Sequence, residues 1–260
     1  MDTSITIEEL GWRGRLAFLG DMHGEIYSLT RHLRRIKERG IDLAVSVGDL
    51  GYNFAETPRR FNVELHEELT RLDLHLLWID GNHENHPWLR NLPLNAEGFA
   101  VATDRILWAP RGHCWTLAEK RFGAAGGAFS VNATSLVPEV SWFPRVEEVL
   151  EEDVERFKGA ELDVLVTHDV PAAVPMHSRL QLTPAVERRA HESRERLQNI
   201  VELTGAQRTF SGHWHKRVTE DWRRQDGGVT TSTVLGLEHQ NEAVVGYDLF
   251  SDELFEMYRA

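Results

Sequence analysis

Leu-Ala-Phe-Leu-Gly-Asp-Met-His-Gly, residues 16–24, joins a short apolar run to a polar turn. Similar apolar runs at Leu43–Val47, Leu74–Ile79, Leu162–Val166 and Arg208–Ser211 also end in polar stretches. Short apolar runs of this kind, alternating with helical patterns, predict βαβ units with parallel strands. The polar stretches are Gly20-Asp21-Met22-His23-Gly24, Gly48-Asp49, Gly81-Asn82-His83-Glu84, Thr167-His168-Asp169 and Gly212-His213-Trp214-His215.

These polar stretches are expected to meet in one crevice, because parallel sheets bind ligands beyond the carboxyl ends of their strands. Together they offer two aspartates, one asparagine and four histidines as ligands. Such oxygen and nitrogen ligands suit Mn²⁺, Fe or Zn²⁺ better than Ca²⁺ or Mg²⁺. The set exceeds what one ion with an open position takes, but it suffices for two ions that share a carboxylate. Two metals about 3.5–4 Å apart clamp the attacking and leaving oxygens of a phosphoryl transfer.

Each motif alone has a simpler explanation. Asp21-Met22-His23 after a strand can be a turn followed by a surface histidine, and aspartate favours turns in any protein. His168 alone can be a hydrogen-bonded histidine at a strand end. The joint occurrence of the motifs at predicted strand ends favours a metal site.

The chain resembles the calcineurin-like metallophosphoesterases, whose pattern is Asp-x-His, Gly-Asp, Gly-Asn-His-(Asp/Glu), His and Gly-His-x-His, in this order. The match runs from Gly20 to His215. The resemblance implies one domain over residues 1–260, folded as a four-layer α/β/β/α sandwich with two central mixed β-sheets flanked by helices. It also implies two divalent metal ions, with Mn²⁺ preferred over Fe, Zn²⁺, Ni²⁺ or Mg²⁺.

The resemblance assigns the ligands residue by residue. Asp49 would bridge the two ions, and His83 would not be a ligand but would protonate the leaving oxygen or stabilise its charge. Gly127 belongs to a glycine-rich stretch that borders the site in this family. One metal would be held by Asp21, His23, Asp49 and His215, and the other by Asp49, Asn82, His168 and His213.

The expected reaction is hydrolysis of a phosphate ester by a hydroxide that bridges the two metals. The sequence departs from the protein phosphatase and dinucleoside polyphosphate hydrolase branch, which usually has Gly-Asp-x-Val-Asp-Arg-Gly where residues 48–54 read Gly-Asp-Leu-Gly-Tyr-Asn-Phe. Asp80 also replaces the arginine that usually precedes Gly-Asn-His-Glu. These departures favour a small phosphodiester such as a cyclic nucleotide. The alternatives are a phosphomonoesterase, a nuclease, and a non-catalytic protein-binding scaffold.

Composition limits the expected class of substrate and the expected cellular compartment. The chain has 260 residues, 41% of them hydrophobic, and a net charge of −12, which disfavours extended nucleic acids and favours a small phosphate-ester substrate. No apolar run approaches the ~20 residues of a membrane span. Cys114 is the single cysteine, and no signal peptide is recognisable at the N-terminus, so we expect a cytoplasmic protein.

The remaining segments predict the helices and strands that support the site, and two loops beside it. His177 and Arg179 lie on a loop at 170–183 and are candidate substrate contacts, as are His86 and Trp88 unless they are plain loop residues. The long segment 130–145 is typical of a lid or binding loop. Helices are expected at 25–38, 58–71, 145–157 and 184–203, and a second sheet from 106–108, 114–117, 121–122, 217–222, 228–235 and 243–250.

Overall fold

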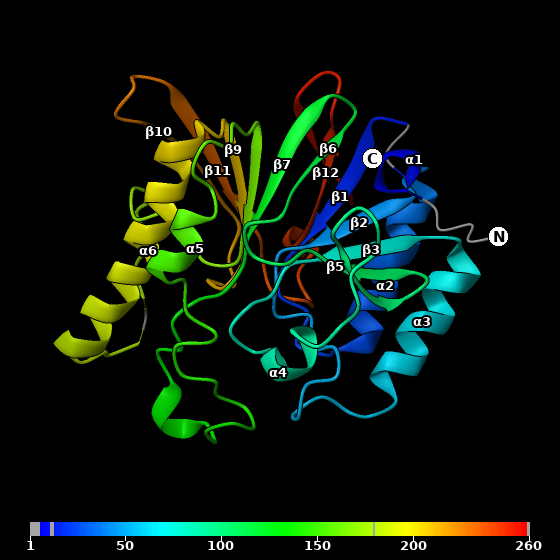
Figure 1. Cartoon of the computed structure of the whole chain (residues 1–260). Coiled ribbons are helices and arrows are strands. Elements are labelled where there is room, and N and C mark those ends of the chain that lie inside the picture. The colour runs from blue at the N-terminus through cyan, green and yellow to red at the C-terminus, as the bar shows by residue number, and fades with distance from the viewer. Residues whose placement is uncertain (1–5, 11–12, 179, 259–260) are drawn as a thin grey trace.

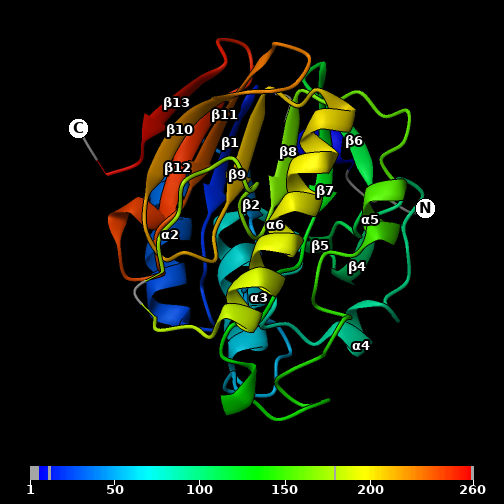
Figure 2. The ribbon, with the colours of Figure 1, turned by 90° about the vertical axis from the view of Figure 1, so that its left-hand side faces the viewer.

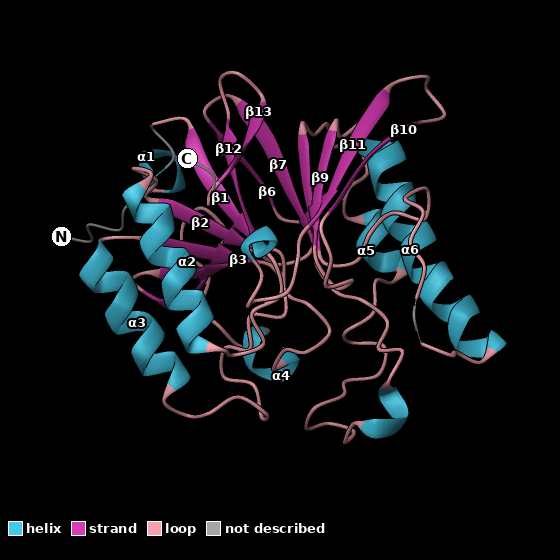
Figure 3. Ribbon diagram, turned by 180° about the vertical axis from the view of Figure 1, so that it is seen from behind, coloured by secondary structure: helices cyan, strands magenta, loops and turns pink. Residues whose placement is uncertain are grey.

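Two β-sheets face each other across a shared core, and helices cover their outer faces (Figure 1). The computed structural model describes residues 6–10, 13–178 and 180–258. Helices α2 (Ile26–Glu38) and α3 (Phe61–Leu72) cover one sheet, and α5 (Glu151–Glu155) and α6 (Pro184–Thr204) cover the other, as Figure 3 shows from behind. The predicted four-layer α/β/β/α sandwich with two mixed sheets is confirmed.

The first sheet has seven strands in the order β13-β12-β1-β2-β3-β5-β4. Its centre is parallel, since β1 pairs with β2, β2 with β3 and β3 with β5. The carboxyl ends of these strands therefore point to one edge. The strands are β1 (Arg15–Leu19), β2 (Leu43–Ser46), β3 (His75–Trp78), β4 (Ala100–Thr103), β5 (Ile106–Trp108), β12 (Val244–Asp248) and β13 (Glu253–Glu256).

The second sheet has six strands in the order β10-β11-β9-β8-β7-β6. Strands β7, β8, β9 and β11 are parallel, and the edge strands β6 and β10 are antiparallel to their neighbours. Figure 2 shows α6 lying along the outer face of this sheet. The strands are β6 (Cys114–Leu117), β7 (Lys120–Ala125), β8 (Val164–Thr167), β9 (Arg208–Ser211), β10 (Val218–Arg223) and β11 (Val229–Val234).

Two strands predicted for the second sheet lie in the first. β5 pairs parallel with β3, and β12 pairs antiparallel with β1, with Arg15 opposite Asp248. A sequence pattern identifies a strand but not its neighbour. Val244 of β12 packs in the core beneath α2, while Val245 packs in the core between the sheets, so this strand needs a position covered on both faces. The edge strands β4 and β13 were not predicted. Both are only four residues long and partly exposed, so their sequences lack the apolar run of a buried strand.

The long helices form where the apolar spacing predicts them. On α2 the buried side chains recur every three or four residues, at Ile26, Leu29, Leu33 and Ile36. Thr183 caps the start of α6 through its side chain, and the left-handed Gly205 ends it. Within the described parts of the chain, no helix is both long enough and apolar enough to span a membrane.

The helix predicted over residues 145–157 is wrong for its first half, since α5 covers only Glu151–Glu155. Two buried carboxylates bind backbone N–H groups upstream instead of extending a helix. Glu147 Oε2 accepts from Phe143 N at 3.0 Å, and Glu148 Oε1 accepts from Arg145 N at 3.1 Å. Three short helices were not predicted: α1 (Ile7–Leu10), α4 (His86–Leu89) and the 3₁₀ turn η1 (Ala133–Ser135). A further 3₁₀ turn, η2 (Asn241–Ala243), precedes β12.

Aromatic rings join the two sheets directly behind the strand ends. Phe18 of β1 stacks on Phe210 of β9 with ring centroids 3.7 Å apart, and Tyr247 of β12 lies 5.5 Å from Phe210. Near the opposite end, Asp252 accepts hydrogen bonds from Lys120 and Arg208 of the second sheet, at 2.8 and 2.9 Å. Contacts at two levels therefore fix the distance between the sheets.

A buried histidine ties α2 to the C-terminal part of the chain. His32 Nε2 lies 2.7 Å from the carbonyl oxygen of Glu238, and the hydroxyl of Tyr258 lies 2.7 Å from Nδ1. The carbonyl only accepts, so Nε2 carries the proton and Nδ1 accepts from the tyrosine. Burial lowers the pKa of His32 to about 4.

The lowered pKa of His32 predicts that the folded protein loses stability in acid. The folded-state pKa of this histidine lies below the unfolded value of 6.5, so the unfolded chain binds more protons between these two values and stability falls as the pH drops. The loss is at most about 3 kcal/mol. His32→Gln keeps a donor and an acceptor but does not titrate, so its free energy of unfolding in urea should fall less between pH 6.5 and 4. The exposed His191→Gln serves as control, and equal slopes for His32→Gln and wild type would contradict the assignment.

Candidate metal centre

Eight candidate side chains from both sheets meet at the carboxyl ends of five parallel strands. Figure 3 shows the loops gathering at this edge of the two sheets. The order of the sheets explains the meeting, because β1, β2 and β3 are neighbours in one sheet and β8 and β9 are neighbours in the other. Asp21 and His23 follow β1, Asp49 follows β2, Asn82 and His83 follow β3, His168 follows β8, and His213 and His215 follow β9.

One group consists of Asp21, His23 and His215. The Nε2 atoms of His23 and His215 face each other at 3.2 Å. Oδ2 of Asp21 lies 3.0 Å from His215 Nε2 and 3.9 Å from His23 Nε2. All three ligand atoms lie within 4.8 Å of one another, which is a spacing that one cation between them can satisfy.

The second group consists of Asp49, Asn82 and His168, with His213 beside it. His168 Nε2 lies 3.1 Å from Asn82 Oδ1 and 3.4 Å from Asp49 Oδ1. The ring of His213 lies edge-on to that of His168, with centroids 5.1 Å apart.

Asp49 stands between the two groups, and each of its oxygens faces one of them. Oδ1 is the oxygen near His168, whereas Oδ2 lies 3.9 Å from His23 Nε2. Oδ1 also accepts from the backbone N–H of His83 at 2.8 Å. The carboxylate is buried and held in this orientation, which is the arrangement that a bridging ligand requires.

Surrounding groups orient the ligand atoms toward the site. His168 Nδ1 lies 2.8 Å from the carbonyl oxygen of Val47, so Nδ1 donates and Nε2 is left as the ligand atom. Asn82 Nδ2 donates to Ser130 Oγ at 3.0 Å, which turns Oδ1 toward His168. A buried Glu84 accepts from Leu50 N at 3.0 Å and so holds the turn that carries Asp49.

The backbone at the site is strained. His23, Asp49, His213 and His215 all have positive φ, between 44° and 63°. Each such residue costs about 1–3 kcal/mol and persists where the surroundings fix it, a pattern that concentrates at functional sites. Gly81 is required for close approach, because a Cβ there would overlap the Asp49 carboxylate.

Electrostatics couple Asp49 to its histidines. Burial opposes its ionisation, but the nearby His168 and His83 outweigh burial and hold the pKa of Asp49 well below its usual value. Burial likewise opposes a charge on His168, yet Asp49 raises the pKa of His168 to about 10. Asp49 and His168 thus each favour the charged form of the other. The donor set fits divalent cations: the ligand atoms of Asp21, His23 and His215 lie within 4.8 Å of one another, as do those of Asp21, Asp49 and His168, and the amide oxygen of Asn82 lies beside His168.

A cleft of ≈ 650 Å³ opens over these groups. Its lining includes the candidates His83 and His177. Asn132, Asp169 and Lys216 also line it, although the sequence analysis gave these three residues no role. Gly127 is not among the lining residues, since its N–H donates to Asp80 O at 2.7 Å behind the site. Arg179 lies outside the described residues.

His86 and Trp88 have structural positions. His86 is buried against the ring of Phe143, with centroids 5.7 Å apart, and Trp88 packs against Tyr52 at 5.6 Å. Neither lines the cleft that contains the candidate ligands.

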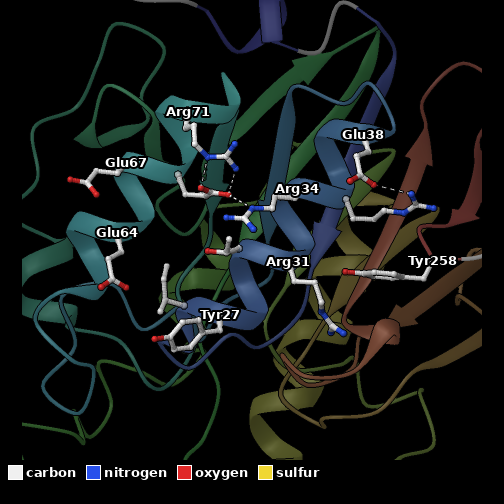
Figure 4. A pocket seen from close by; sticks show the side chains of 12 residues that line it. Tyr27, Arg31, Arg34, Glu38, Glu64, Glu67, Arg71 and Tyr258 are labelled. Atoms are coloured by element: carbon white, nitrogen blue, oxygen red, sulfur yellow. Dashed lines mark hydrogen bonds and ion pairs between the residues drawn. The ribbon is translucent and has the colours of Figure 1, made fainter.

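A hollow of similar volume, ≈ 690 Å³, lies between α2 and α3 (Figure 4). Several of its charged side chains pair with one another: Glu68 accepts from Arg34 at 2.7 Å and from Arg71 at 2.6 Å. Because the candidate metal ligands lie elsewhere, we assign the site to the cleft at the strand ends.

Behind the site, Asp80 pairs with the buried guanidinium of Arg111. Arg111 Nη2 lies 2.6 Å from Asp80 Oδ2, and its guanidinium also donates to the carbonyl oxygens of Glu147 and Glu148, at 3.0 and 2.6 Å. Asp80 and Arg111 thus hold the backbone at Gly127 and at Glu147 and Glu148. The sequence signal was the departure at Asp80, but nothing local identified Arg111 as its partner.

The calcineurin-like phosphoesterase family model matches residues 14–217, so the chain belongs to this family. The family typically binds two divalent metals, and membership indicates a metal-dependent phosphoester hydrolase. A search of the curated proteins finds no match.

Two solved structures show the same fold at low identity. Protein TT1561 of Thermus thermophilus has a TM-score of 0.55 and 11% identity, over 93% of this chain and 96% of that one. A dimetal phosphatase from Danio rerio has a TM-score of 0.53 and 12% identity, over 93% of this chain and 94% of that one.

The Asp80–Arg111 pair should be far more important for stability than a surface pair. Arg111→Met leaves the buried Asp80 carboxylate without its cation and should cost about 3–5 kcal/mol in urea unfolding. Adding Asp80→Asn removes the orphaned charge and should recover part of that loss. Arg105→Met, which breaks a pair with the exposed Asp73, should cost less than about 1 kcal/mol. Equal costs for Arg111→Met and Arg105→Met would refute this difference.

Proposed function

We propose that the protein holds two divalent cations, preferably Mn²⁺, and hydrolyses a small phosphodiester such as a cyclic nucleotide. One ion would bind Asp21, His23, Asp49 and His215. The other would bind Asp49, Asn82, His168 and His213. The observation that carries the proposal is the orientation of Asp49, whose two oxygens face the two ligand groups separately.

The bound ions would lower the pKa of a water molecule and offset charge on the phosphate oxygens. Residues of the chain position the bridging carboxylate and the proton donor. Asp49 and its hydrogen bond to His83 N keep the bridge and the catalytic histidine in fixed relation. The His83 ring lies at the cleft, 5.7 Å from the ring of His23 and 6.0 Å from that of Phe54. We assign His83 to donating a proton to the leaving oxygen or stabilising its charge.

The charge of the cleft supports a diester. Among the lining residues that the structure describes, Lys216 is the only lysine or arginine. A phosphomonoester carries up to two negative charges at neutral pH and a diester one, so a diester needs fewer cations from the protein. His177 at the cleft is a candidate contact for the phosphate or its ester arm.

A substrate panel tests this function. Purified protein with Mn²⁺, Mg²⁺ or Zn²⁺ is given bis(4-nitrophenyl) phosphate, 4-nitrophenyl phosphate, 2′,3′- and 3′,5′-cyclic nucleotides, and single-stranded DNA. We expect metal-dependent turnover with a higher kcat/KM for the diesters than for the monoester. A faster monoester reaction would replace the diester assignment, and cleavage of DNA alone would indicate a nuclease.

Substitution at His83 and Asp49 should separate catalysis from metal binding. His83→Ala should retain both metals by elemental analysis while kcat falls by about 10²–10⁴-fold, the usual contribution of a general acid. Asp49→Ala should lose metal and activity together. The exposed His191→Ala on α6 controls for the loss of a histidine. An unchanged rate in His83→Ala would remove it from the mechanism, and full metal content in Asp49→Ala would refute the bridge.

A further inference from the structure

The cleft has an apolar wall that the candidate metal ligands do not explain. Val131, Leu180, Leu182 and Ala190 all line it beside the site. They come from the segment after the glycine-rich stretch, from the loop that follows β8, and from α6. The loop after β8 carries the candidate ligand His168 at its start, whereas Leu180 and Leu182 lie near its far end, before α6.

This apolar surface is open to solvent where it meets the cleft. Leu180 is 60% exposed, and Val131, Leu182 and Ala190 are half-buried. Covering an exposed leucine with an apolar ligand group removes its surface from water, which contributes favourable binding free energy.

The wall rests on well-anchored elements. Arg194 of α6 is buried and donates to the carbonyl oxygens of Val170 and Val174, which secures the start of the loop. Arg189 binds Glu148 at 2.8 Å and lies 4.7 Å from the ring centre of Phe129, which ties α6 to the segment leading to Val131. The parts of the subsite formed by Val131 and Ala190 are thus held by anchored elements, as in most ligand pockets.

Polar residues also line the cleft, among them Asn132, His177 and Ser178 from the same segments as the apolar wall. Lys216 directly follows the candidate ligand His215, and Asp169 is occupied by Trp214 Nε1 at 2.8 Å and by Val170 N at 2.7 Å. A phosphate bound at the site would therefore meet positive charge at the metal ions and at Lys216, and its second ester arm could contact the apolar residues of the cleft.

We infer that the cleft selects phosphodiesters whose retained arm is apolar and at least as large as a phenyl ring, seated on Val131, Leu180, Leu182 and Ala190. This inference rests on the proposed function, because it places the phosphate at the metal site. It narrows the proposed diester from a cyclic nucleotide, whose ester arm is a polar ribose, to an ester with a separate apolar arm. The shared chemistry is an apolar ester arm, whether a planar ring or a hydrocarbon chain.

Three diesters test it: methyl, phenyl and hexyl 4-nitrophenyl phosphate. They share the 4-nitrophenolate leaving group, so differences in kcat/KM report the second arm. With Mn²⁺ present, wild type should favour phenyl or hexyl over methyl by about tenfold or more. Preference for phenyl would identify a planar ring as the natural arm, and preference for hexyl a hydrocarbon chain.

Leu182→Ser should bring this ratio toward one. Leu203→Ser, an exposed leucine of α6 outside the cleft, should keep the wild-type ratio. A wild-type ratio near one, or a ratio that Leu182→Ser leaves unchanged, would overturn the inference while leaving diester hydrolysis intact.

A binding measurement separates this inference from the proposed function. Calorimetry on the protein with Mn²⁺ present should show diphenyl phosphate binding at least about tenfold more tightly than dimethyl phosphate, and Leu182→Ser should remove the difference. If wild type hydrolyses no diester yet shows this Leu182-dependent binding, the proposed function fails and the apolar subsite stands. Equal binding of the two diesters would overturn the subsite.

Discussion

The structure depends on keeping one carboxylate, Asp49, ionised in a buried position between two β-sheets. Removing a carboxylate from water is costly unless positive charge surrounds it. Here the compensating groups come from both sheets: His83 follows β3 of the first, and His168 follows β8 of the second. The charge of Asp49 thus links the two halves of the fold, and a cation on either side would also stabilise this carboxylate.

Several features of the chain serve that carboxylate. Gly81 leaves room for it, Glu84 holds the turn that carries it, and the N–H of His83 donates to it. Left-handed backbone at Asp49 and at three nearby histidines shows that these turns are held in strained conformations by their surroundings. The stacking of Phe18 on Phe210 fixes the separation of the strands on which the turns sit.

The sequence was most informative where short-range chemistry repeats. Apolar runs followed by Gly-Asp, Gly-Asn-His or Gly-His-x-His predicted the strands whose ends meet, and the helical spacing of Leu29 and Leu33 predicted α2. Pairing between distant segments was not predictable in this way. β5 and β12 were assigned to the wrong sheet, because strand propensity carries no information about neighbours. The partnership of Asp80 with Arg111 was missed for the same reason.

Anomalous diffraction from a crystal grown with Mn²⁺ tests the bridging carboxylate directly. We expect two peaks about 3.5–4 Å apart, one on each side of Asp49. One peak should contact His23 and His215, and the other His168 and Asn82. A single peak, or a pair that does not share Asp49, would contradict the binuclear centre.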